Sequence, residues 1–424
     1  MSAATHILAN GAIVAADTVP GVETIAVGVS FNAGARDEIA AENGLAHLLE
    51  HMAFKGTHSR SARAIAEAIE GVGGWLNAST GYQRTSYYAR VLARDLDRAF
   101  DVLADILYNA LYDSDALEKE RRIVAQEIAE AHDNPEDHVY TLLQETCFPN
   151  QSLGRPILGV LETLDALDAD AFLRFMAARY RPENMVVAVA GGIAPDAVFQ
   201  AAERHFGARS GGESDFGAAV RTPARFASGV RFDRRTIEQS HVALALRGEE
   251  VGAPGLYAMR VFAEILGGGM ASRLFQTIRE ERGLAYSVYA FAEAYDDVGL
   301  IDIYAGTEDR SAPAAIAAAL RCVSDMTERV TASELERAKA ILKASVLMGL
   351  ETPLGRVEAM THQLYTEKRL LGAEALCARI DAVTSDGVRE AAETALSGPI
   401  ALSAVGQADA EALQQAVANV GGDA

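Results

Sequence analysis

The chain has 424 residues, half of them hydrophobic, and a formal net charge of −21 at pH 7. This length exceeds what a single hydrophobic core serves, so two or more domains are expected. The acidic charge argues against a nucleic-acid ligand, whose phosphates require a basic surface, and no apolar run is long enough to span a membrane.

No secretion or organelle signal is expected in the N-terminal residues, since no basic region precedes an apolar stretch. Their pattern instead predicts a β-hairpin that turns at Asn10-Gly11. Cys147, Cys322 and Cys377 are scattered, without a Cys-x-x-Cys spacing. Such cysteines are typical of reduced thiols, which favours a cytoplasmic location.

A strand is predicted at 23–31, and a helix follows from about Gly44 to Lys55. In this helix His47 and His51 are four residues apart, so both imidazoles share a face and can reach one metal ion. Zinc binds imidazole nitrogen, and a catalytic zinc keeps one position for water. Glu50 flanks the same face and can take a proton from that water. The order reverses the commoner His-Glu-x-x-His helix and is the inverzincin arrangement.

The rest of the first half is predicted from hydrophobic periodicity and from turn and capping signals. Two more strands are expected at 74–80 and 85–92, and one buried strand at 184–190. Helices are expected at 61–69, 94–111, 114–133, 136–147, 168–179 and 195–206.

The helix predicted at 114–133 carries Glu120 and Glu127 seven residues apart, which is two helical turns, so both lie on one face. Glu127 can be the third protein ligand of the metal. Glu120 can be an outer group that orients an imidazole or positions water, and so assists catalysis. Taken alone, two glutamates seven residues apart on a helix are normally part of a solvated face.

The His47–His51 segment and Glu127, which lies 76 residues after His51, together resemble the pitrilysin/insulinase family of inverted-motif zinc peptidases. The resemblance covers nearly the whole chain. Residues 6–160, including the Leu-Gly-Arg-Pro-Ile-Leu-Gly segment at 153–159, are especially similar to the catalytic subunit of the mitochondrial processing peptidase and its bacterial relatives. The resemblance implies one Zn²⁺ per chain.

In the resembling family, an asparagine and an alanine of one strand hold the substrate backbone. This role carries over to Asn77 and Ala78, because a strand edge binds an extended peptide through main-chain hydrogen bonds. From the residues alone, Asn77 is equally a turn residue. The chain departs from the family pattern at Gln83, where an acidic residue is usual, which implies a local change in subsite chemistry.

Small and polar residues at 209–226 are typical of a linker between an N-terminal catalytic domain, 1–208, and a C-terminal domain, 227–424. The pattern of the first half then begins again, which predicts an internal duplication into two α+β domains, each a mainly antiparallel sheet covered by helices. The family is built from such pairs, which form a clamshell half-chamber. The expected elements are strands at 241–246, 285–295, 299–305 and 399–405 and helices at 254–266, 272–281 and 409–417.

Arg279 and Tyr286 match the family's arginine–tyrosine pair, seven residues apart, in the domain that faces the zinc. The arginine would hold a substrate carbonyl or carboxylate, and the tyrosine would donate to the oxyanion of the tetrahedral intermediate. Without the resemblance, a helix that ends at Gly283 explains both residues.

These features predict a zinc metalloendopeptidase that cleaves peptides or unfolded polypeptides held as an added strand in an enclosed chamber. Four family domains make a full chamber, so a homodimer, or a heterodimer with a related chain, is expected. Arg279 and Tyr286 then act either in cis or in trans. The alternative is a non-catalytic binding subunit of a heterodimeric peptidase, although such subunits typically lose ligands or the base. The acidic charge fits basic peptide substrates or solubility alone.

Overall fold

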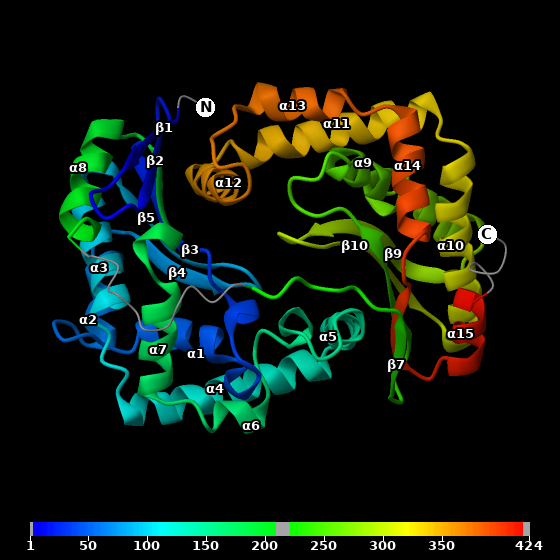
Figure 1. Ribbon diagram of the computed structural model, residues 1–424, viewed down its shortest axis with the longest axis horizontal. Helices are drawn as coiled ribbons and strands as arrows, with labels where there is room; N and C mark the ends of the chain where they lie inside the picture. Colours follow the sequence, from blue (N-terminus) through cyan, green and yellow to red (C-terminus); the bar gives the residue numbers. More distant parts are fainter. Residues whose placement is uncertain (1–2, 209–220, 419–424) are drawn as a thin grey trace. The chain divides into compact units, whose positions relative to one another are not determined.

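The computed structural model describes residues 3–208 and 221–418, and the chain divides into two compact units (Figure 1). The first unit consists of Met1–Ala129, Arg155–Thr222 and Leu347–Ala373. The second consists of Glu130–Gly154, Pro223–Val346 and Glu374–Ala424. Each unit therefore contains a segment from the other half of the chain. Of the linker expected at 209–226, residues 209–220 lie outside the described residues.

The first unit contains a six-stranded sheet with the order β1-β2-β6-β3-β5-β4. All neighbouring strands are antiparallel except β2 and β6, which are parallel. The predicted N-terminal hairpin is confirmed by the pairing of β1 with β2. The strands are β1 (Ala4–Ile7), β2 (Ile13–Thr18), β3 (Thr24–Phe31), β4 (Trp75–Thr80), β5 (Thr85–Leu92) and β6 (Met185–Gly191).

One face of this sheet forms the main core of the unit together with the helices. Val27 and Val29 of β3 share this core with Leu48 and Phe100 from two of the helices. Side chains alternate between the faces of a strand, so Ala26, the residue before Val27, points to the opposite face. The helices are α1 (Leu45–Ala53), α2 (Ala62–Glu70), α3 (Leu96–Tyr108), most of α4 (Ser114–Asp133), α6 (Leu161–Leu164), α7 (Ala169–Arg179) and α8 (Pro195–Phe206).

The opposite face is covered by α12 (Pro353–Thr366), which arrives from far along the chain. Arg356 Nη1 lies 2.7 Å from Asp17 Oδ2, and the Tyr365 hydroxyl donates to the Ser30 carbonyl at 2.6 Å. Gly28 allows the close approach, because a Cβ there would lie only 2.7 Å from Cγ1 of Val357. This helix therefore buries the second face of β3, which explains why that strand is apolar on both sides.

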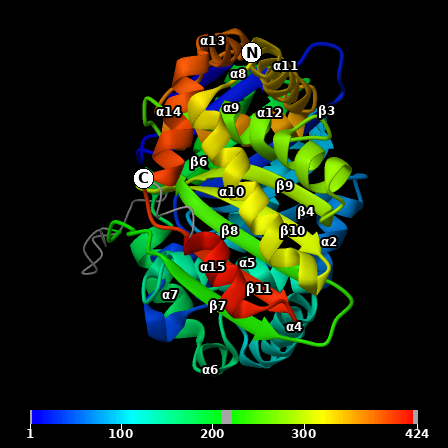
Figure 2. The ribbon, with the colours of Figure 1, turned by 90° about the vertical axis from the view of Figure 1, so that its right-hand side faces the viewer.

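The second unit contains a five-stranded sheet with the order β7-β11-β8-β10-β9, in which only β7 and β11 are parallel. Helices α9, α10, α14 and α15 pack against one face of it (Figure 2). The strands are β7 (Gly229–Arg234), β8 (Ser240–Gly248), β9 (Ala285–Ala294), β10 (Gly299–Thr307) and β11 (Ala401–Gly406). The helices are α5 (Pro135–Cys147), α9 (Leu256–Gly267), α10 (Ala312–Glu328), most of α11 (Ala332–Gly349), α13 (Ala373–Asp381), α14 (Ser385–Leu396) and α15 (Ala410–Ala418).

The two sheets share one topology. Numbered by their order along the chain, the strands β2-β6-β3-β5-β4 of the first sheet correspond one by one to β7-β11-β8-β10-β9 of the second. This confirms the predicted α+β class with two similar, mostly antiparallel sheets. The equivalent helices α5 and α12 are exchanged: α5 packs on β7, β8 and β11, while α12 packs on β2, β3 and β6. Hydrophobic periodicity gives no sign of this exchange, because a helix needs an apolar partner but does not specify which one.

Two local elements differ from the expected pattern. The segment Phe275–Glu281, predicted as part of an α-helix, is a π-helix, a form often found at functional sites. Strand β7 was not predicted, although Val230 and Phe232 alternate with polar residues as in a strand. Among the described helices, none combines the length and the apolar character needed to cross a membrane.

Candidate active site

Helix α1 has one buried face and one face that carries the reactive side chains. Its buried residues are Leu45, Ala46, Leu48, Leu49, Met52 and Ala53. His47 and His51 lie one turn apart on the other face, with side chains 13% and 18% exposed. The apolar face therefore fixes the helix against the core and leaves both imidazoles accessible.

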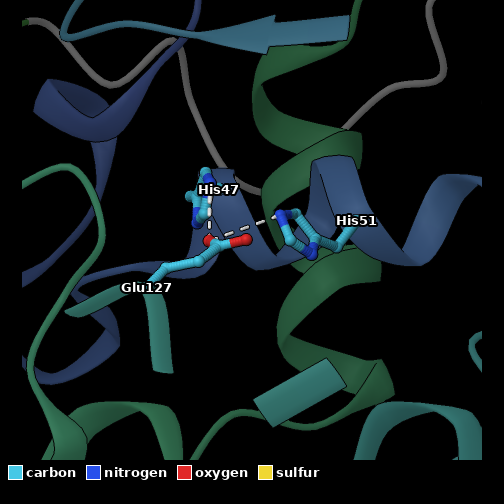
Figure 3. Close-up of side chains that lie close together, drawn as sticks. All are labelled: His47, His51 and Glu127. Atoms are coloured by element: carbon cyan, nitrogen blue, oxygen red, sulfur yellow. Dashed lines mark ion pairs between the residues drawn. The ribbon is translucent and has the colours of Figure 1, made fainter. Parts of the chain in front are cut away.

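His47, His51 and Glu127 lie together, with Glu127 of α4 reaching toward both rings (Figure 3). The Oε2 atom of Glu127 is 3.7 Å from Nε2 of His47 and 3.7 Å from Nε2 of His51. Two donors bound to one zinc at about 2.0–2.2 Å can be separated by at most about twice that distance. Both distances from Glu127 satisfy that limit, and the ligand atoms of all three residues lie within 4.8 Å of one another, so this group could hold a zinc ion.

The protonation state of His47 also suits a metal ligand. Burial, and to a smaller extent the nearby His51, lower the pKa of His47 to about 4. The imidazole is therefore neutral at pH 7 and keeps a free lone pair, which the ligand form of histidine requires. With the anionic Glu127, the donor set is the nitrogen and oxygen combination that zinc prefers.

Glu120, which is 4% exposed, contacts the imidazole of His51. Its Oε2 is 3.1 Å from Nδ1 of His51, and its Oε1 is 2.8 Å from Nζ of Lys55. When Nδ1 donates to the carboxylate, the Nε2 lone pair of His51 is left facing Glu127. Lys55 was not singled out in the sequence, although it lies four residues after His51, the spacing of one helical turn.

Glu50 lies beside the ligand pair and is held by a neighbouring strand. The hydroxyl of Thr80, at the end of β4, donates to its Oε2. Burial raises the pKa of Glu50, the Thr80 hydrogen bond and His51 oppose this rise, and the charge of Glu127 adds to it. A carboxylate with a raised pKa is a stronger proton acceptor. Thr80 was missed in the sequence because nothing local indicates that it reaches α1.

Strand β4 is an edge strand of the first sheet and pairs with β5 in the antiparallel direction, with Asn77 opposite Tyr88. Its other edge pairs with no strand of the described chain. The side chain of Asn77 is exposed, and Oδ1 accepts from the Ala78 backbone N–H at 2.9 Å. Ala78 is 8% exposed and faces the core. Because Thr80 ends this strand, the free edge runs toward Glu50.

Arg279 and Tyr286 belong to the second unit, whereas the seven other candidate residues all belong to the first. The guanidinium of Arg279 lies 4.8 Å from the ring centroids of both Phe275 and Tyr286. Tyr286 is 69% exposed. The pair is thus joined by a cation–π contact, and the phenol remains free to meet another molecule.

A second group of metal-binding residue types, His132, His138 and Asp233, lies in the second unit. The positively charged guanidinium of Arg235 already contacts this group. Its Nε donates to Asp233 at 2.7 Å, and its Nη2 lies 2.6 Å from Nε2 of His132. A metal ion would have to displace this guanidinium, so the first group is the better zinc candidate.

Two family models match the chain: Insulinase (Peptidase family M16) over residues 13–160, and Peptidase M16 inactive domain over residues 166–342. A protein of Rickettsia felis described as an uncharacterized zinc protease is 38% identical over 346 residues, which cover 81% of this chain and 83% of that protein. The chain belongs to the insulinase family. A Bacillus subtilis protein described as the uncharacterized zinc protease YmxG is 37% identical over 344 residues, which cover 81% of this chain and 83% of that protein.

Solved structures show the same insulinase-family fold. A protease from Helicobacter pylori matches with a TM-score of 0.88 at 20% identity, covering 96% of this chain and 99% of that one. A peptidase M16 inactive domain from Pseudomonas fluorescens matches with a TM-score of 0.88 at 19% identity, covering 97% and 99%. His47, Glu50, His51 and Glu127 all fall within the segment matched by the insulinase model, residues 13–160, and outside the segment called inactive. The relatives' names indicate a zinc protease.

Proposed function

We propose that this chain is a zinc metalloendopeptidase that cleaves peptides or unfolded polypeptides bound as an added strand. The observation that carries the proposal is the convergence of His47, His51 and Glu127 on one point beside the carboxylate of Glu50. The family and the zinc proteases among its members agree with it. A non-catalytic subunit would not need all four residues.

Zinc held by His47, His51 and Glu127 would supply a Lewis acid that polarises the scissile carbonyl and lowers the pKa of water. Glu50 accepts the proton of the attacking water as the new C–O bond forms. It then passes that proton to the leaving amine nitrogen as the C–N bond breaks. Thr80 holds the Glu50 carboxylate in place during both transfers.

The free edge of β4 is the proposed site for the substrate backbone. An extended peptide pairs with such an edge whatever its side chains, which suits an enzyme that acts on unfolded segments. Asn77 and Ala78 would hold the peptide so that its scissile bond lies near Glu50. Arg279 would hold a substrate oxygen and Tyr286 would donate to the oxyanion, in a chamber closed by the second unit or by a partner chain.

Metal removal tests the proposal directly. The chain as purified is expected to contain one zinc, to digest an unfolded polypeptide and to lose that activity after dialysis against phenanthroline, because the water would no longer be activated. Adding one equivalent of Zn²⁺ should restore cleavage, measured with a fluorogenic peptide. A chain that binds zinc and cleaves nothing would instead be a binding subunit. Cleavage that survives complete loss of metal would refute the zinc mechanism.

Assembly as a dimer, with the arginine–tyrosine pair acting in trans, is the finer part of the proposal. Neither Glu50→Gln nor Tyr286→Phe alone should be active, because one lacks the base and the other lacks the oxyanion donor. A mixture should regain activity, since one site in a mixed dimer would then carry both wild-type groups. Each variant mixed with itself is the control, and light scattering gives the native mass. A monomer whose mixture stays inactive would show that the pair acts in cis.

A further inference from the structure

The N-cap residue of helix α1 provides no side chain that could accept hydrogen bonds from the first turn. This residue is Gly44, in a left-handed conformation with φ of 93°. The first N–H groups of a helix have no partner within the helix. In a helix of nine residues, these groups need partners from elsewhere if His47 is to stay in place.

Glu38 provides these partners from the loop before the helix. Its Oε1 accepts from the Ala46 backbone N–H at 2.7 Å, and its Oε2 accepts from the Gly44 N–H at 2.9 Å and from Nδ2 of Asn43 at 3.0 Å. The residue is 5% exposed. A negative charge at this end also interacts favourably with the helix dipole. The carboxylate thus spans the turn that leads directly into His47.

A second segment holds this loop in place, and it is part of the motif at 153–159. Arg155 donates to the backbone carbonyl of Glu38, and the Asn43 side chain donates to the Pro156 carbonyl at 2.9 Å. The Thr163 hydroxyl donates to the Asn43 carbonyl at 2.7 Å. The loop and this segment therefore form one hydrogen-bonded block around the start of α1.

The same contact explains a glycine of that motif. Gly159 has a φ of 78°, and a Cβ added to it would lie 2.6 Å from the Asn43 carbonyl and 2.7 Å from Cα of Gly44. Only a glycine permits this approach. The segment thus touches the very residues that Glu38 bonds.

We propose that Glu38 is a positioning residue of the peptidase, whose buried carboxylate fixes the first turn of α1 and thereby the orientation of His47 and Glu50. The inference deepens the proposed function and rests on it. Its physical support is that one buried carboxylate accepts hydrogen bonds from the Gly44 and Ala46 N–H groups and from the Asn43 side chain. Burial raises the pKa of Glu38 to about 7, against the opposing effect of its N–H donors and of Arg155. A group that only filled space would not need to accept three hydrogen bonds there.

The test compares Glu38→Gln with Glu42→Gln. Glutamine has the same shape, but its NH₂ group would face an N–H donor and one of the two backbone bonds would be lost. Glu42 lies in the same loop and pairs with Arg174 instead of α1, so it is the matched control. For Glu38→Gln, zinc affinity in chelator competition should fall about tenfold and kcat should fall while KM for the peptide stays near wild type. Thermal unfolding should show that the fold is retained.

Zinc affinity and kcat at the wild-type level in a folded Glu38→Gln chain would overturn the inference. If that variant does not fold, Asn43→Ala decides. It keeps Glu38 but removes one donor and the bond to Pro156, so a smaller loss of zinc affinity is expected, and no loss would overturn the inference. A wild-type chain that binds no zinc would refute the proposed function instead. Amide exchange of Gly44 and Ala46 would then still test the cap, because it should be faster in Glu38→Gln.

Discussion

Replacing Glu50 by glutamine is expected to lower kcat for peptide hydrolysis by about 10²- to 10⁴-fold, while zinc remains bound. The amide cannot accept the proton of the attacking water or return it to the leaving amine. Zinc should stay because its proposed ligands are His47, His51 and Glu127, and the Thr80 hydroxyl can still donate to the amide oxygen. Steady-state rates with a fluorogenic peptide and the metal content of the same sample provide the measurement.

Glu67→Gln is the matched control for this change. Glu67 lies on α2, where its side chain is 59% exposed and pairs with Arg63 one turn away. The same loss of charge there should leave kcat within about twofold of wild type, since exposed pairs of this kind contribute little. Turnover near wild type in Glu50→Gln would mean that another group accepts the proton. Loss of zinc in that variant would mean that Glu50 is itself a ligand.

Local periodicity predicted the elements that hold the site. The helix expected at 114–133 is confirmed with these limits, and the strand expected at 23–31 is confirmed as β3 (Thr24–Phe31). These patterns are readable because a helix or strand repeats its buried positions within a few residues. The spacing of His47 and His51 is informative for the same reason, since it fixes both rings on one helical face.

Contacts between distant segments were beyond the reach of the sequence. Nothing near Thr80 or Lys55 indicates that one meets Glu50 and the other meets Glu120. The exchange of α5 and α12 depends on which apolar faces are complementary in three dimensions. Glu38 illustrates the limit well: it stands in a loop where a glutamate is unremarkable, and only the folded chain places it under α1.

Glu127→Gln is expected to weaken zinc binding by more than about a hundredfold, which exceeds the usual effect of removing an outer-shell partner of a metal site. The carboxylate supplies both the third donor atom and the only formal negative charge among the three proposed ligands, whereas an amide oxygen is a neutral and weaker donor. Peptide hydrolysis should fall in parallel. Metal content after dialysis against a competing chelator, measured beside activity, tests both effects.

Glu118→Gln separates loss of a ligand from loss of charge on the helix. Glu118 lies on the same helix α4, where its exposed carboxylate pairs with Arg121 and Arg122. This variant should keep one zinc per chain and full activity, because these ion pairs are at the surface. If Glu127→Gln also keeps a full equivalent of zinc, the two imidazoles must have a different third partner. The convergence of 3.7 Å contacts at Glu127 Oε2 would then not mark the metal position.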